Sequence, residues 1–188
     1  MLGEFAYGVK RACGKSTTVL SFHEAITSVA FLTFRELDLE WGVLEVGLGG
    51  RLDASNVIKR PAASVIVSID YDHEHVLGST LPEIAREKAG IIKKGAPVII
   101  GAIPKEAREV IEDVALKNQS PLLMAGRDYQ FAPLLQEESS ARYLFKAKLL
   151  GKDFSFAFSP KLSGVHQAHN MAVALSTALS IGISEQNS

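Results

Sequence analysis

Apolar residues recur along the first two thirds of the chain in blocks that alternate between helical and strand-like spacing. Ser21 and Glu24 form a capping-box pattern, and the apolar positions after them have the spacing of an amphipathic helix over 21–37. Strand-like runs follow at 40–46 and 62–69, and the second is apolar nearly throughout. Such a run is typical of a parallel strand that is covered on both faces. The pattern predicts a buried helix followed by two strands of one sheet.

The same alternation continues to residue 125. Thr80 and Glu83 repeat the capping box, and the helix that they open is expected to reach Ile92. The remaining elements of this part are expected to be a strand at 96–101, a helix at 104–117 with Pro104 near its start, and a short strand at 120–125. Strand, helix and strand in this order indicate a parallel sheet with crossover helices.

The pattern changes after Gly126. Three strand-like stretches, 128–136, 142–150 and 153–159, are separated only by short polar segments, which favours an antiparallel meander. The predicted fold is therefore of the α/β class. Its expected parts are a mostly parallel sheet flanked by helices over 1–125, an antiparallel β subregion over 126–164, and a final helix over 165–182 rich in alanine and leucine.

Composition limits the classes of partner. The chain has 188 residues with 20 basic and 21 acidic side chains, and they form no long block of one sign. This balance argues against binding to nucleic acid or to an anionic membrane surface. Cys13 is the only cysteine, and no run of about twenty apolar residues is present. We expect a cytoplasmic, monomeric protein that acts on small molecules.

The most informative segment is LEVGLGGRLDASNV, residues 44–57. Its glycines allow a tight turn and a close approach of the backbone to a ligand just after the predicted strand carrying Glu45. Arg51, Asp53 and Asn56 then present polar groups. A binding loop at the end of a strand is one interpretation. A plain glycine-rich turn with Glu45 in a salt bridge is the other.

A second polar segment, SIDYDHEHVLG at 68–78, follows the next predicted strand. Its acids and histidines are expected at the sheet edge that Glu45 also occupies, because parallel strands end at a common edge. Carboxylates with substrate oxygens suit Mg²⁺, whereas two histidines with acids could equally indicate Zn²⁺ or Mn²⁺. A solvated polar loop is an equally good interpretation of this segment alone.

Lys88 lies in the middle of a predicted helix among small and apolar residues. A lysine that loses contact with water favours its neutral, reactive amine, although most such side chains extend to the surface. CGKSTT, residues 13–18, imitates the end of a phosphate loop. Gly8 is one residue too far from Gly14 for that motif, and a helix is predicted where the motif needs a strand. We therefore do not interpret it as a phosphate loop.

Several of these segments together resemble a known family. The motifs LEVGLGGRLDASNV, the DH and LG of DHEHVLG, REKAGIIK, LSFHEAIT and HQAHNMAVAL, in this order and spacing, closely resemble folylpolyglutamate synthases and dihydrofolate synthases of the Mur ligase superfamily. The first motif is highly specific for them, and the others are shared more widely among Mur-type ligases. The resemblance covers nearly the whole chain.

The resemblance implies a set of site residues. Glu45 and His73 are the implied Mg²⁺ ligands, together with Lys88 as a lysine carbamylated by CO₂, and Asp72 supports them from a second shell. Asn170 is the implied ATP contact. The pterin substrate is expected to meet two segments, which consist of Ser21, Phe22, His23, Glu24, Leu52, Asp53 and Ala54.

The implied reaction is the ATP-dependent addition of L-glutamate to dihydropteroate or a folate through an acyl phosphate. Family members also have a GTNGKGS phosphate loop and a C-terminal domain, and neither occurs in this sequence. We therefore expect a chain truncated at both ends and inactive alone. Two rival interpretations stay open. One is a non-catalytic fragment or paralogue with residual pterin binding, and the other is a dinucleotide-binding oxidoreductase, because GLGG follows a predicted strand.

Overall fold

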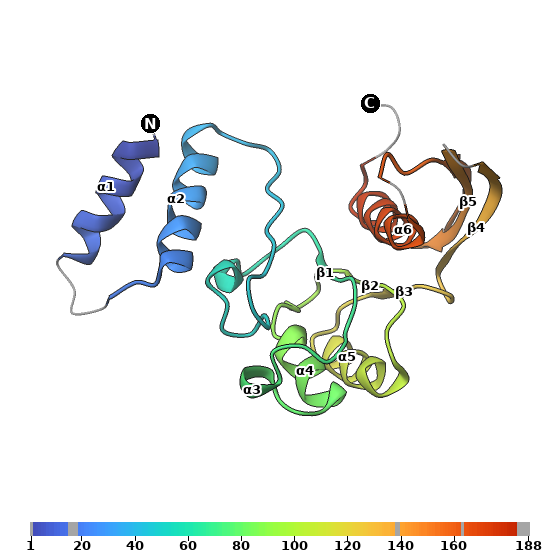
Figure 1. The fold of residues 1–188 in the computed structure, drawn as a ribbon, viewed down its shortest axis with the longest axis horizontal. Helices are drawn as coiled ribbons and strands as arrows, with labels where there is room; N and C mark the ends of the chain where they lie inside the picture. The colour runs from blue at the N-terminus through green and yellow to red at the C-terminus, as the bar shows by residue number, and fades with distance from the viewer. Residues whose placement is uncertain (1, 15–18, 138–139, 163, 184–188) are drawn as a thin grey trace. The chain divides into compact units, whose positions relative to one another are not determined.

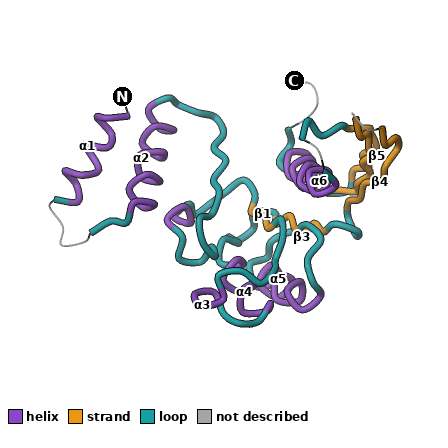
Figure 2. The backbone as a smooth tube through the Cα atoms, in the orientation of Figure 1, coloured by secondary structure: helices purple, strands orange, loops and turns teal. Residues whose placement is uncertain are grey.

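The computed structural model describes residues 2–14, 19–137, 140–162 and 164–183 (Figures 1 and 2). Two compact units make up the chain, Met1–Ile58 and Lys59–Ser188, here called unit 1 and unit 2. The boundary falls before the first strand of the parallel sheet. The predicted division into 1–125, 126–164 and 165–182 was drawn by type of sheet instead of by compactness, and it stays a prediction.

Unit 1 is built from two helices and a helical turn. α1 (Leu2–Cys13) packs against α2 (Phe22–Glu36), and the 3₁₀ turn η1 (Ala54–Val57) contacts α2. The predicted capping box starts α2: the Glu24 N–H donates to Ser21 Oγ at 3.2 Å, and the Ser21 N–H donates to Glu24 Oε2 at 2.7 Å. α1 also places a helix where a phosphate loop at CGKSTT would need a strand, although residues 15–18 lie outside the described part.

The strand predicted at 40–46 is wrong. The structure assigns no strand to these residues, and no backbone ladder among the described residues includes them. Trp41 is 47% exposed and Val43 is 95% exposed. An apolar pattern shows which face a segment could bury, but a strand forms only where a neighbouring backbone supplies hydrogen-bond partners. Within unit 1 this segment has no such neighbour among the described residues.

Unit 2 contains the predicted parallel sheet. Its strands are β1 (Ser64–Ile66), β2 (Val98–Ile100) and β3 (Leu122–Met124), in the order β1-β2-β3. All pairs are parallel, with Val65 opposite Ile99 and Ile99 opposite Leu123. The helices between them are α3 (Glu74–Leu77), α4 (Leu81–Ala89) and α5 (Lys105–Lys117). The predicted order is confirmed, with shorter strands and with α4 ending before Ile92.

One face of the parallel sheet is covered by α4 and α5. Ile84 and Ala85 of α4 and Ile111 of α5 are fully buried, and they pack with Val98 and Ile100 of β2. Alternate side chains of a strand point to opposite faces, so Ile99 points the other way. Figure 1 shows both helices on one side of β1–β3. The first core of unit 2 therefore lies between these helices and the sheet.

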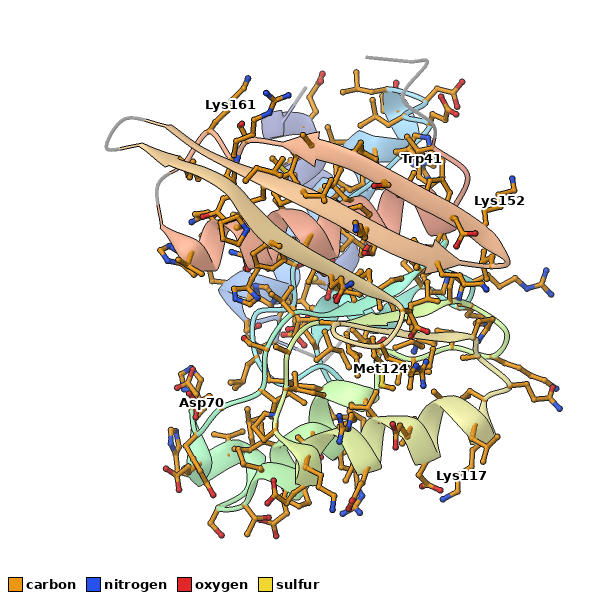
Figure 3. All side chains as sticks on the ribbon, turned by 90° about the vertical axis from the view of Figure 1, so that its right-hand side faces the viewer. Trp41, Asp70, Lys117, Met124, Lys152 and Lys161 are labelled. Carbon is orange, nitrogen blue, oxygen red and sulfur yellow. The ribbon has the colours of Figure 1, made fainter. Side chains whose placement is uncertain are left out.

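The other face is covered by the second sheet and the last helix. β4 (Tyr129–Glu137), β5 (Ser140–Leu149) and β6 (Lys152–Phe158) form the predicted antiparallel meander, and α6 (Val165–Ser180) follows it. One core joins them, and its buried members include Ile99, Leu123, Tyr129, Tyr143, Phe145, Leu149, Phe158, Ala168, Ala172 and Val173. Figure 3 shows this sheet and α6 on one side of the parallel strands and α5, which carries Lys117, on the other. The predicted α/β class is confirmed.

The backbone segments that directly follow β1 and β2 approach each other closely at Val67 and Gly101. A Cβ atom at this position would lie 2.1 Å from the carbonyl oxygen of Val67, which belongs to the backbone and cannot rotate away. Gly101→Ala is therefore expected to lower the free energy of unfolding by about 1–3 kcal/mol, as overpacking typically does. Urea unfolding followed by circular dichroism measures this.

Gly8→Ala is the matched control for this substitution. Gly8 lies inside α1, and a Cβ there meets no atom within 4 Å. Alanine favours a helix over glycine, so this variant should be neutral or slightly more stable. Equal stability of Gly101→Ala and the unmodified chain would show that the two strand ends separate without cost.

Candidate functional site

The glycine-rich loop of unit 1 is organised around the Asp53 carboxylate. Its Oδ2 accepts hydrogen bonds from the Gly47 N–H at 3.0 Å and the Leu48 N–H at 3.2 Å. Its Oδ1 accepts from the Ser55 N–H at 2.8 Å and the Ser55 hydroxyl at 2.6 Å. The side chain is 3% exposed. Glycine is favoured at Gly49, where φ is +66°, which agrees with the tight turn predicted from the sequence.

His23 joins this loop to the first turn of α2. Its Nε2 lies 3.4 Å from Asp53 Oδ2, and a Cβ at Gly47 would lie 2.9 Å from the imidazole ring. Gly47 thus leaves the room that the His23 ring occupies. The contact brings together the two segments, 21–24 and 52–54, that the sequence predicts as one binding region. Both belong to unit 1.

The Asp53 carboxyl is held in its ionised form. Burial acts to raise its pKa, but hydrogen bonds from Ser55, Leu48 and Gly47 outweigh burial and leave the pKa below its ordinary value. A carboxylate that accepts several backbone hydrogen bonds gains more from its charge than it loses by leaving water. The loop therefore contains a fixed negative charge that its own backbone compensates.

The other predicted substrate residues divide into two groups. Ser21 and Glu24 bond to each other in the α2 cap, and these bonds hold the Glu24 pKa below its ordinary value. Phe22 and Leu52 are 81% and 80% exposed. Leu52 therefore exposes apolar surface next to Asp53, whereas Phe22 lines a hollow beside α1 and α2.

The polar segment of unit 2 runs from the end of β1 into α3. Asp70, Asp72 and His75 are exposed, and His73 is the N-cap of α3 in a left-handed conformation, with φ +49°. His73 Nε2 lies 3.6 Å from Asp72 Oδ1, and the His73 and His75 rings are 6.3 Å apart. The family resemblance implies that Asp72 supports the metal site. The structure places its side chain beside that of His73, and the role stays a prediction.

Lys88 lies in the last turn of α4, which contacts α3. It is half-buried, and its neighbour Ala89 is buried. A half-buried lysine is compatible with both predicted readings, an amine shielded from water or an extended surface side chain.

Glu45 belongs to unit 1 and is exposed, so the buried strand end predicted around it does not occur. In the described part of the chain, no three His, Cys, Asp or Glu side chains are grouped to hold a metal ion. The predicted metal site includes a carbamylated lysine, Lys88, and a lysine is not one of these four residue types. Glu45, His73 and Lys88 therefore stay a prediction.

Asn170 lies in the second turn of α6 and is exposed. The preceding residue, His169, packs edge-on against Phe131 of β4 with ring centroids 4.8 Å apart. The antiparallel sheet therefore contacts the start of α6 next to Asn170. The sequence motif around Asn170 does not reveal this contact, because Phe131 is 38 positions away in the chain.

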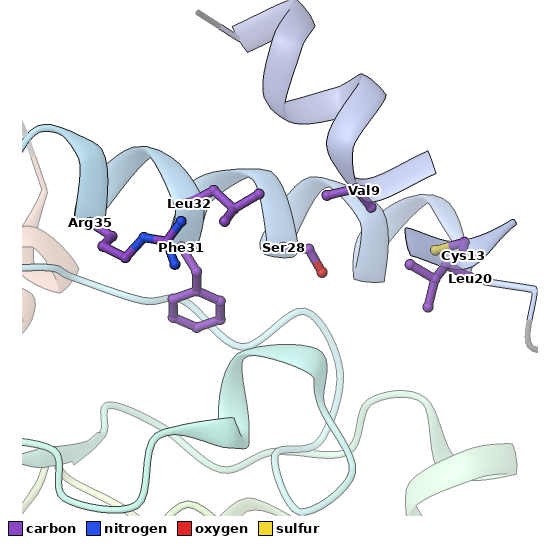
Figure 4. Close-up of a pocket in the computed structure, with 7 residues that line it drawn as sticks. All are labelled: Val9, Cys13, Leu20, Ser28, Phe31, Leu32 and Arg35. Atoms are coloured by element: carbon purple, nitrogen blue, oxygen red, sulfur yellow. The ribbon is translucent and has the colours of Figure 1, made fainter. Parts of the chain in front are cut away.

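A groove of about 490 Å³ lies between α1 and α2 of unit 1 (Figure 4). Its lining is Val9, Cys13, Leu20, Ser28, Phe31, Leu32 and Arg35, and none of these was predicted as a site residue. A second hollow of about 520 Å³ adjoins α1 and α2 and includes the predicted residue Phe22. The amphipathic spacing predicted over 21–37 is a sequence signal for the α2 side of both grooves.

No family model matches the chain. Individual proteins do match it. The chain is 35% identical over 170 residues to a dihydrofolate synthase/folylpolyglutamate synthase of Mycobacterium tuberculosis, and the match covers 88% of this chain and 34% of that protein. A protein of the same name from Bacillus subtilis is 36% identical over 166 residues, which covers 82% of this chain and 35% of that protein. The chain thus spans about a third of the length of these relatives.

Solved structures agree with the sequence comparison. The crystal structure of folylpolyglutamate synthase from Thermotoga maritima superimposes with a TM-score of 0.83 and 32% identity, covering 98% of this chain and 43% of that one. A structure named FPGS-AMPPCP-folate complex superimposes with a TM-score of 0.83 and 31% identity, covering 92% of this chain and 42% of that one. No described helix is long and apolar enough to cross a membrane.

Proposed function

Because this chain belongs to the folylpolyglutamate synthase and dihydrofolate synthase family, we propose that it forms part of an ATP-dependent amide ligase. The ligase would join L-glutamate to the carboxyl group of dihydropteroate, of a folate, or of both. The observation that carries this proposal is the contact of His23 with Asp53. It unites the two segments that the family resemblance assigns to the pterin substrate.

The acceptor site is the region of unit 1 around the Asp53 loop. Leu52 offers exposed apolar surface to a flat aromatic ring system, and His23 offers a partly exposed polar edge. Phe22 would add apolar surface from the start of α2. Ligand sites commonly combine apolar walls with a few placed polar groups. The names of the relatives include both dihydrofolate synthase and folylpolyglutamate synthase. The assay described below therefore tests both dihydropteroate and a folate as acceptors.

ATP is the proposed second substrate. A similar structure is named FPGS-AMPPCP complex, and AMPPCP is an ATP analogue, which supports nucleotide binding in the family. In this chain Asn170 would contact the nucleotide from the exposed face of α6. Its amide can both donate and accept hydrogen bonds, as adenine and ribose groups require.

Mg²⁺ is the proposed metal. The donor types fit a hard cation, because Glu45 supplies a carboxylate and a carbamate on Lys88 would supply a second anionic oxygen, with His73 as a nitrogen ligand. A bound Mg²⁺ would neutralise charge on the ATP phosphates and on the acyl phosphate. Asp72 beside His73 would orient the imidazole by accepting a hydrogen bond from it.

The proposed reaction has two steps. The acceptor carboxylate attacks the γ-phosphate of ATP, which forms an acyl phosphate and releases ADP. The amine of glutamate then attacks the acyl carbon and displaces phosphate, and an amide remains. In this scheme the unit 1 loop holds the acceptor carboxylate in line, and fixed geometry of this kind supplies much of the rate.

A steady-state assay tests the function. The chain and the longest protein that its gene encodes are each incubated with ATP, Mg²⁺, L-glutamate and either dihydropteroate or tetrahydrofolate. The expected result is one ADP per new amide product, with no ADP when the acceptor or glutamate is omitted. Dihydropteroate binding without turnover by either protein would favour the non-catalytic alternative. Tight NADH binding without ATP dependence would favour the oxidoreductase. A cytoplasmic location and a monomeric state stay predictions.

A further inference from the structure

The Asp53 carboxylate has little capacity left for a ligand. Two carboxylate oxygens offer about four lone-pair positions. Four hydrogen bonds from Gly47, Leu48 and Ser55 occupy both oxygens, and His23 Nε2 lies beside Oδ2. With 3% of the side chain exposed, a substrate could reach the carboxylate only by displacing these donors. Each displaced donor would be left without a partner inside the loop, which is costly.

The groups around the Asp53 carboxylate come from three different parts of unit 1. Gly47 and Leu48 begin the glycine-rich turn, Ser55 belongs to η1, and His23 belongs to the first turn of α2. Asp53 is also the N-cap of η1. One buried carboxylate therefore fixes the start of the loop, its end, and the helix beside it.

We propose that Asp53 is a positioning residue that acts on the acceptor substrate only through the groups it holds. Its carboxylate sets the path of the loop from Gly47 to Ser55 and the placement of His23, and the exposed side chains on these elements make the contacts. Leu52 directly precedes Asp53 and is 80% exposed, so its side chain is the first candidate for such a contact with the substrate. The inference rests on the proposed function for the identity of the substrate, but the arrangement of the loop does not depend on it.

Substitution of Ser55 distinguishes a positioning role of Asp53 from direct binding of the substrate by Asp53. Ser55 is buried, with 7% of its surface exposed, and its hydroxyl donates a hydrogen bond to Asp53 Oδ1 at 2.6 Å. A substrate in solution cannot contact it without opening η1. If Asp53 binds substrate directly, loss of the Ser55 hydroxyl should matter little. If Asp53 positions the loop, the loss should weaken acceptor binding even though Ser55 touches no ligand.

Hydrogen exchange tests the first half of the proposal without any activity. In Asp53→Asn, one oxygen becomes an NH₂ group that cannot accept, so either the Gly47 and Leu48 amides or the Ser55 amide lose their acceptor and should exchange about tenfold faster, or more. Ser55→Ala should show a smaller increase in the same segment. Asp113→Asn, which alters an exposed ion pair with Lys117 on α5, is the control and should show no change there. Protected amides in α2 report that unit 1 of each variant is folded. Unchanged exchange at Gly47, Leu48 and Ser55 in Asp53→Asn would overturn the proposal.

Kinetics in the longest protein that the gene encodes test the second half. Asp53→Asn should raise KM for the acceptor about tenfold, and Ser55→Ala about threefold, with KM for ATP unchanged in both. Because both act through one loop, the double variant should resemble Asp53→Asn alone. Ser28→Ala is the matched control, since its hydroxyl bonds only the Glu24 carbonyl of its own helix. Additive effects, or a normal acceptor KM in Ser55→Ala, would indicate direct binding. Absence of ligase activity in the unmodified protein would count against the proposed function and leave the exchange result to decide the loop's role.

Discussion

Replacing His73 by alanine is expected to lower kcat/KM for ATP-dependent glutamate addition by about a hundredfold or more, as loss of a group that stabilises transition-state charge typically does. The imidazole is the proposed nitrogen ligand of Mg²⁺, and Asp72 lies 3.6 Å from it in a position to orient it. The remaining activity should also need a higher Mg²⁺ concentration, because one ligand is missing. Initial rates over a Mg²⁺ titration measure both effects.

His75→Ala is the control for this substitution. His75 is exposed like His73, and its ring lies 6.3 Å from that of His73, in the same polar segment. It should keep close to full activity, because the family resemblance assigns it no role. Thermal unfolding of both variants shows whether the left-handed backbone at residue 73 tolerates alanine. Similar losses in both histidine variants would mean that the segment acts through its overall charge, and the assignment of His73 as a ligand would then fail.

The largest effect on stability is expected from Ile111→Ala. Ile111 is fully buried in α5, where it packs in the core between the helices and the parallel sheet. Truncation to alanine removes apolar area from that core and leaves a cavity, which costs about 2–5 kcal/mol for an aliphatic side chain. Chemical denaturation followed by far-ultraviolet circular dichroism gives the change in unfolding free energy.

Leu116→Ala on the same helix is the control, because it removes the same number of carbon atoms as Ile111→Ala. Leu116 is 79% exposed, so its truncation removes little buried area and should change stability by less than about 0.5 kcal/mol. Both substitutions introduce alanine into α5, so helix propensity cancels to a first approximation. If the two variants unfolded at the same denaturant concentration, the packing of α5 on the sheet would have to differ from that described.

The sequence predicted elements well where the signal is local. The capping boxes at Ser21 and Thr80 mark the starts of α2 and α4, because both partners of each box lie within four residues. The strands of the antiparallel sheet were predicted because alternation along β5 places Tyr143 and Phe145 inside and Lys146 outside. A single strand pattern does not contain information about a neighbour, and the error at 40–46 arises from this.

The candidate site shows the same limit. The glycines and Asp53 could be identified as a loop from the spacing of LEVGLGGRLDASNV, but the direction in which Asp53 points could not. That direction depends on Gly47 and Leu48, whose backbone N–H groups carry no signal in the sequence. The contact with His23 joins positions 30 apart in the chain. Only the family resemblance placed those two segments in one site before the structure was known.

The shared core of the two sheets has a consequence for how unit 2 is made in the cell. Ile99 and Leu123 of the parallel sheet are covered by residues of α6, such as Ala172 and Val173, which are synthesised about fifty residues or more later. Until α6 has left the ribosome, the part of this face that α6 covers is exposed to water, and exposed apolar strands promote aggregation during synthesis. The α4–α5 face can close first. A nascent chain that stops before α6 would therefore be a natural client for chaperones that bind apolar segments.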